Sequence, residues 1–153
     1  MEGNLNITFS VPKEEVLKKL ATNSYYRGER VKDENGAHAA RMQSGEDNND
    51  VLNDELELAA ADVVAMITRN LGRCVKKDDA DNLLLFETRA ASNFPETIKE
   101  SVEGAIAAYL FDKALEGWML INMPAEVNNL AQRSVQDAEK LRLLLVEREK
   151  PMR

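Results

Sequence analysis

The spacing of apolar residues changes along the chain, from the alternation typical of a strand to the three-to-four-residue period of a helix. Residues 5–11, LNITFSV, alternate apolar and polar side chains, which predicts a short strand or an extended arm over residues 1–11. Pro12 ends this segment and suits the first turn of a helix, because its missing N–H would have no partner there. We expect that helix to span about three turns. Its apolar face consists of Val16, Leu17, Leu20 and Ala21.

Residues 31–50 have few large apolar side chains, two glycines, and five acidic against two basic residues. This composition predicts a long exposed loop, with ordering on a partner as the alternative. Residues 50–71 then place apolar side chains three, four, seven and eight positions apart, which predicts an amphipathic helix that ends near Gly72. Three consecutive alanines at 59–61 indicate that a neighbouring helix approaches closely.

Residues 76–82, KKDDADN, have the composition of a turn, and the apolar run that follows from Leu83 to Thr88 predicts a buried strand. A single short strand needs a partner to satisfy its backbone hydrogen bonds. That partner is either the amino-terminal arm or a strand from another subunit.

The longest uninterrupted helical pattern covers residues 92–121. Asn93 and Glu96 predict a capping box at its start, with Pro95 in the first turn. At 1.5 Å per residue such a helix is on the order of 40 Å long, which raises the question of what it packs against.

Two glycines interrupt this helix, and a last helical pattern follows it. Gly104 and Gly117 indicate close backbone packing, or a bend at Gly117, because glycine in a helix is otherwise unfavourable. The last helix is expected over residues 124–149, before a short tail at 150–153. Its apolar face is expected to consist of Val127, Leu130, Ala131, Val135, Ala138, Leu141 and Leu145.

Length and charge narrow the class of protein. The 153 residues suit one domain, so we expect residues 1–153 to form a single mainly α unit, a bundle of about four helices with a short strand or hairpin and extended termini. Twenty basic and 27 acidic residues give a net charge of −7 without a basic stripe, which disfavours tight binding to nucleic acid. No signal-peptide pattern and no run of 18 apolar residues occurs, so we expect cytoplasmic synthesis and no membrane insertion.

The sequence contains no common catalytic, phosphate-binding or metal-binding motif. Cys74 is expected to be an inert packed cysteine, and His38 falls in the predicted loop, where a solvated role is expected. Asp78, Asp79 and Asp81 fit a solvated turn better than a cation site, because the calcium-loop glycine is missing. We therefore expect no enzyme activity, no cofactor and no metal site. A pocket of perturbed carboxylates around Asp54, Glu57 and Asp62 would instead indicate an enzyme.

The order of the helical segments resembles the head-to-tail connector, or adaptor, proteins of tailed bacteriophages. The resemblance runs through EEVLKKLA, DELELAAADVVAMITRNLGR, FPETIKESVEGAIAAYLFDKALE and LRLLLVEREKPMR, about two-thirds of the chain. Two departures are a longer connector at residues 31–50 and a longer final helix. The positions that match the family pattern are Ala59, Ala60, Ala61, Leu71, Gly72, Arg73, Pro95, Ile98, Lys99, Ala107 and Tyr109.

This resemblance implies a structural virion protein, made in the cytoplasm of a bacterial host and located in the neck of the particle. It implies a homo-oligomeric ring of about twelve copies that joins the portal protein to the tail or to further connector proteins. An acidic ring would line the exit channel and let DNA pass without specific binding. The alternative is a cytosolic helical module that binds one partner protein.

Several residues are candidates for contact with neighbouring subunits or partners, and ordinary core or tail positions are the alternative for each. They lie on the amino-terminal arm, on the predicted strand, at a helix end and near the carboxyl terminus. The candidates are Phe9, Leu84, Phe86, Trp118, Arg148 and Arg153.

Overall fold

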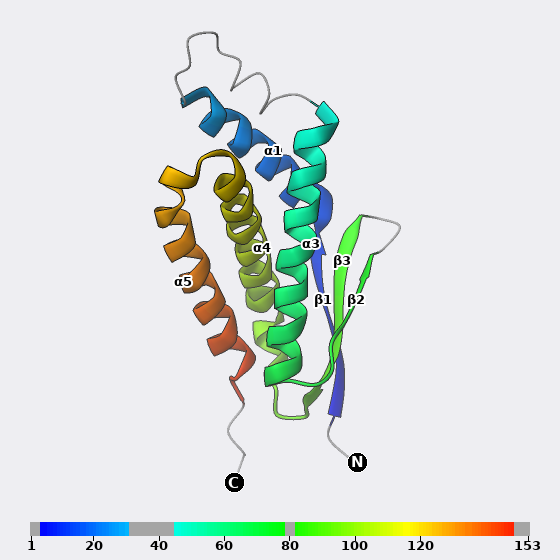
Figure 1. Cartoon of the computed structure of the whole chain (residues 1–153). Helices are drawn as coiled ribbons and strands as arrows, with labels where there is room; N and C mark the ends of the chain where they lie inside the picture. Colours follow the sequence, from blue (N-terminus) through cyan, green and yellow to red (C-terminus); the bar gives the residue numbers. More distant parts are fainter. Residues whose placement is uncertain (1–3, 31–44, 79–81, 149–153) are drawn as a thin grey trace.

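A bundle of helices covers one face of a small antiparallel sheet (Figure 1). The computed structural model describes residues 4–30, 45–78 and 82–148. Within these residues the four helices and three strands confirm the predicted mainly α fold. In chain order they are β1 (Asn4–Pro12), α1 (Lys13–Arg30), α3 (Gly45–Asn70), β2 (Val75–Asp78), β3 (Leu83–Ala91), α4 (Lys99–Asn122) and α5 (Asn128–Leu145), with 3-10 turns at Glu96–Ile98 and Pro124–Glu126.

The sheet has the order β1-β3-β2, and both neighbours run antiparallel to β3. The amino-terminal arm is therefore the partner of the strand at Leu83, and Phe9 lies opposite Phe86 in the register. The turn predicted at residues 76–82 is partly wrong, because Val75–Asp78 is a strand. Charged residues have weak strand propensity, and β2 forms because β3 provides a partner for its backbone. Residues 79–81 lie outside the described residues.

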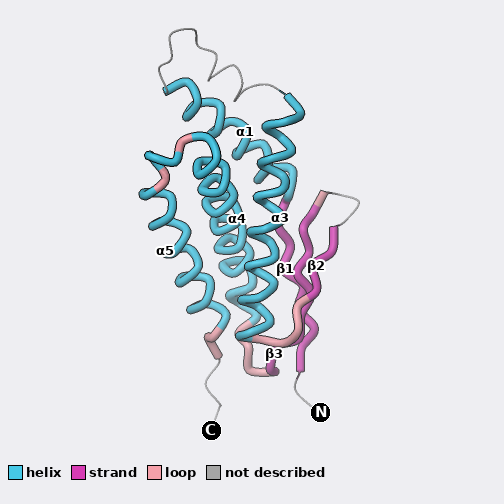
Figure 2. The backbone as a smooth tube through the Cα atoms, in the orientation of Figure 1, coloured by secondary structure: helices cyan, strands magenta, loops and turns pink. Residues whose placement is uncertain are grey.

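One cluster of buried apolar residues fills the space between the sheet and the helices. Alternate side chains of β1 and β3 face inward, so Ile7, Phe9 and Val11 meet the helices while their neighbours in the chain face out. In Figure 2 the helices lie together on one side of the strands. The core is therefore closed within this chain.

Helix α4 is long because it is the central helix of the bundle. It contacts α1, α3, α5 and β1, and its buried residues extend from Val102 to Met119. The capping box predicted from Asn93 and Glu96 is wrong. The residue at the N-cap of the 3-10 turn is Pro95, and the residue at the N-cap of α4 is Ile98. Neither helix start has a side-chain cap hydrogen bond. The long helical pattern is thus explained by packing inside one molecule.

The two glycines of α4 have different surroundings. A Cβ at Gly117 would lie 3.0 Å from Cγ of Glu55 and closer still to its carboxylate, so the predicted close packing is confirmed there. A Cβ at Gly104 would meet nothing within 4 Å, so the same prediction is wrong at that position.

The first two helices are longer than the sequence pattern indicates. Helix α1 runs to Arg30, beyond the expected three turns. Helix α3 begins at Gly45, so the part of the predicted loop at residues 45–50 is wrong, and residues 31–44 lie outside the described residues. Acidic residues are tolerated at the start of α3 because they complement the positive end of the helix dipole.

A side chain from α4 binds one backbone donor on the outer edge of β1. The backbone N–H of Ser10 donates a hydrogen bond of 2.7 Å to Oε2 of Glu103. Since Ser10 lies on an edge strand, this bond satisfies a donor that would otherwise face solvent.

Candidate interaction surfaces

Four of the six residues predicted to contact partners lie in the core instead. Phe9, Leu84, Phe86 and Trp118 are all 0% exposed. The three strand residues are on the inner face of the sheet, where Phe9 makes an edge-to-face contact with Phe94 at a centroid distance of 6.5 Å. Trp118 belongs to the central helix. The interface prediction for these four residues is therefore wrong in the folded chain, and their core alternative is correct.

Arg148 is exposed, but its guanidinium connects the ends of two helices. Nη1 donates to the carbonyl oxygens of Leu145 at 2.8 Å and Glu147 at 2.6 Å, and Nη2 donates to that of Asn70 at 3.1 Å. The group also lies 5.6 Å from the centre of the Phe94 ring. These hydrogen bonds satisfy carbonyl oxygens at the carboxyl ends of α5 and α3, where the helix dipole favours a positive charge. Arg153 lies outside the described residues.

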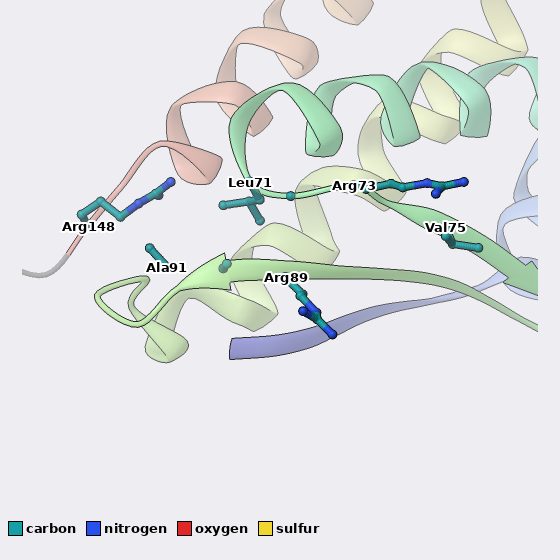
Figure 3. A pocket seen from close by; sticks show the side chains of 8 residues that line it. Leu71, Arg73, Val75, Arg89, Ala91 and Arg148 are labelled. Carbon is teal, nitrogen blue, oxygen red and sulfur yellow. The ribbon is translucent and has the colours of Figure 1, made fainter. Parts of the chain in front are cut away.

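A hollow of about 750 Å³ opens beside Arg148, between the end of α3 and β3. Figure 3 shows the side chains of Arg73 and Arg89 extending away in different directions, while Arg148 reaches back toward the end of α3. The arginines thus surround the hollow and do not converge on one point. We call it the arginine hollow; it is lined by Leu71, Gly72, Arg73, Val75, Arg89, Ala90, Ala91 and Arg148.

The side of α5 that faces away from the bundle carries large apolar side chains. Val135 is 70% exposed and Leu143 is 52% exposed, and Val146 just beyond the helix is exposed as well. These three residues define the α5 outer face. Beside it is an open hollow of about 530 Å³. Its lining consists of Val135, Gln136, Glu139, Lys140, Leu143, Leu144 and Glu147.

The sequence pattern misassigned Val135 to the buried side of this helix. The observed inner face follows Leu130, Ser134, Leu141 and Leu145, so a serine takes the position at which an apolar residue was expected. The sequence does carry a signal for exposed apolar residues at the end of this helix, because the three consecutive leucines at 143–145 cannot all face inward. It carries no such signal for Val135.

Ionisable side chains lie between the helices without forming a catalytic cluster among the described residues. Asp62 accepts a hydrogen bond of 3.0 Å from the Tyr109 hydroxyl, whose pKa is raised by burial and by this bond. Glu57 forms salt bridges with Lys13 at 3.3 Å and Lys76 at 2.8 Å. The carboxylates suggested for an enzyme site therefore have separate structural partners, and Asp54 is exposed.

The carboxylate of Glu55 has a perturbed pKa. Burial raises the pKa above its usual value of 4.5, and the charges of Asp54 and Glu116 raise it further, while Lys113 opposes the shift. The folded chain therefore binds this proton more tightly than the unfolded chain does.

We expect Glu55→Gln to change how stability depends on pH. In the native protein, the stabilising effect of the raised Glu55 pKa on the free energy of unfolding is fully present below pH 4.5, where the carboxyl group is protonated. This effect is lost as pH rises through the raised pKa of the folded chain. The glutamine variant should therefore gain stability relative to the native protein between pH 4.5 and neutral pH, as measured by urea unfolding. Glu126→Gln, at an exposed position, controls for the loss of one negative charge. A constant difference across that range would contradict the prediction.

Cys74 is a packed cysteine, as predicted. Its side chain is buried, and burial, with a smaller effect of Glu87, raises the pKa of the thiol to about 11. The thiol is therefore protonated at neutral pH. Across residues 4–30, 45–78 and 82–148, no cluster of three or more potential metal ligands occurs. His38, Asp79 and Asp81 lie outside the described residues.

No helix in the described part of the chain is both long and apolar enough to span a bilayer. Comparisons with known proteins find no relative: no protein-family model, no curated protein and no solved structure matches the chain. The class of protein is thus defined by its fold, a helical bundle on a three-stranded antiparallel sheet.

Proposed function

We propose that this chain is a structural assembly protein of the head-to-tail connector kind, which forms a ring between a bacteriophage portal and the tail. The observation that carries the proposal is the α5 outer face, where large apolar side chains remain in water although the core is already closed. Apolar patches of this kind mark protein contacts. The connector class itself rests on the resemblance of the helical segments described above.

Two different surfaces are available for a ring contact. A ring requires heterologous contacts, in which one patch of a subunit binds a different patch of the next. In Figure 1, α5 lies on one side of the bundle, and α3 and β2 lie toward the other. Between α3 and β2 is an open groove of about 500 Å³ with Ala61, Val64 and Val75 in its wall.

The two surfaces carry a small excess of opposite charge. The hollow beside the α5 outer face is lined by two acidic residues and one basic residue, Glu139, Glu147 and Lys140. The groove between α3 and β2 is lined by Arg73 together with Lys76 and Glu57, which form a salt bridge with each other. Complementary charges set the orientation of a contact, and burial of the apolar side chains contributes roughly 25 cal/mol per Å². We therefore propose that the α5 outer face of one copy enters the groove of the next. The net charge of −7 per copy suits a channel through which DNA passes.

The ring is tested by electron microscopy of the protein mixed with the portal protein of the same virus. We expect rings of this chain on the portal, and protein that never decorates the portal would contradict the connector assignment. A one-to-one complex with a different protein, without rings, would favour the alternative of a helical interaction module.

The contact surface is tested by Leu143→Glu. A charge at the centre of the α5 outer face should weaken assembly at least about tenfold, because a desolvated unpaired carboxylate is costly. Leu120→Glu is the matched control, since Leu120 is 54% exposed at the end of α4 and lies outside the proposed contact. Light scattering at a series of concentrations, with portal present and absent, measures the effect. Equal assembly of the two variants would contradict the assignment of this face.

A further inference from the structure

The arginine hollow is positively charged on an otherwise acidic protein. The guanidinium groups of Arg73 and Arg89 have no ion-pair or hydrogen-bond partner among the described residues. Arg148 donates to neutral carbonyl groups, so its charge is not cancelled by a carboxylate. None of the residues that line the hollow is acidic. Three positive charges therefore surround a concave surface without a counter-charge in its lining.

The lining between these arginines is apolar. Leu71, Val75, Ala90 and Ala91 contribute side chains to it. Gly72 lies so close to β3 that a Cβ there would be 2.7 Å from the carbonyl oxygen of Arg89, so the backbone itself forms part of the wall. The hollow combines a cationic rim with an apolar floor of small side chains, an arrangement that suits a ligand bearing both anionic and apolar groups.

Nucleic acid fits this surface less well than an acidic peptide. A long polyanion would extend from the hollow over the rest of the protein surface, where the net charge of −7 repels it. A short peptide with a few carboxylates can stay within the hollow, where the nearby arginines attract it. Salt screens its repulsion by acidic residues more than about 8 Å away. The segment EKPMR at residues 149–153 has one acidic and two basic side chains, so it offers no charge complementarity to the hollow.

We propose that the arginine hollow binds an acidic peptide segment of a partner protein, with carboxylates at Arg73, Arg89 and Arg148 and a small apolar side chain on the floor between them. Arginine is suited to this role because its planar guanidinium can hold a carboxylate through two hydrogen bonds. The proposal goes beyond ring formation and does not depend on it, because it requires only the chain and a peptide. Arg73 and Val75 also line the groove proposed for the ring contact, so binding of the peptide is measured on unassembled protein.

The test measures binding of a short fluorescein-labelled peptide of alternating glutamate and valine by fluorescence anisotropy. We expect saturable binding that weakens as salt increases, and no binding of the matching lysine and valine peptide. Absence of binding by the acidic peptide, or equal binding of both peptides, would overturn the proposal. Tighter binding of a labelled oligothymidylate than of the acidic peptide would also overturn it, in favour of nucleic acid.

Substitutions locate the binding site. Arg89→Gln and Arg73→Gln should each weaken binding of the acidic peptide by about threefold to tenfold, as expected for exposed charge-assisted contacts. Arg69→Gln is the matched control, because Arg69 is an exposed arginine in the last turn of α3 that does not line the hollow. Thermal melting checks that each variant folds. Equal loss of binding in all three variants would show a diffuse charge effect and overturn the assignment to the hollow.

Discussion

Replacing Trp118 by alanine is expected to lower the free energy of unfolding by about 3–5 kcal/mol. Trp118 is 0% exposed near the carboxyl end of the central helix α4, so its removal leaves a cavity that the surrounding helices can fill only in part. Urea unfolding of the dilute protein, followed by far-ultraviolet circular dichroism, measures the loss.

The control is Leu120→Ala, two positions further along α4, where the side chain is exposed. It should change the free energy of unfolding by less than about 0.5 kcal/mol. If Trp118→Ala instead left unfolding unchanged and abolished only assembly, Trp118 would be an interface residue after all, and the core assignment would be wrong.

Two glycine substitutions are expected to have opposite effects. Gly72→Ala should destabilise the protein by about 1–3 kcal/mol, because its Cβ would lie 2.7 Å from the backbone carbonyl oxygen of Arg89. That oxygen belongs to the central strand, which is held by pairing with β1 and cannot move aside easily. Gly104→Ala should stabilise the protein by about 0.5–1 kcal/mol, because its Cβ would enter open space and alanine favours the helix.

Thermal unfolding of the two variants measured side by side gives the sign of each effect. A stabilising Gly72→Ala would mean that α3 and β3 separate more readily than the structure indicates. A destabilising Gly104→Ala would show that something covers the exposed side of α4 in solution.

The elements with strong periodicity were predicted from the sequence, and those formed by tertiary contacts were not. The alternation around Ile7 predicted β1, and the spacing of apolar residues predicted most of α3 and α4. Strand β2 was missed because its residues, VKKD, have no periodicity of their own and depend on pairing with β3. Tertiary pairing overrode local propensity at this strand.

The candidate surfaces were harder to predict than the fold. A buried phenylalanine such as Phe86 and an exposed one give the same local pattern, so sequence alone could not separate core from interface. Val135 lies four residues from Ala131 and three from Ala138, which is helical spacing, yet it faces solvent because Ser134 takes the inner position. The arginine hollow joins Arg73, Arg89 and Arg148 from distant parts of the chain, and only the folded arrangement brings them to one end of the bundle.

The hydrogen bond from Ser10 to Glu103 limits the ways in which copies of this molecule can associate. An incoming strand would have to displace the carboxylate before it could add to β1, and it would leave a charged group without its donor. Sheet extension, the route by which exposed strands propagate into fibrils, is thereby obstructed on this side. The helices can thus expose apolar side chains while this edge of the sheet resists strand addition.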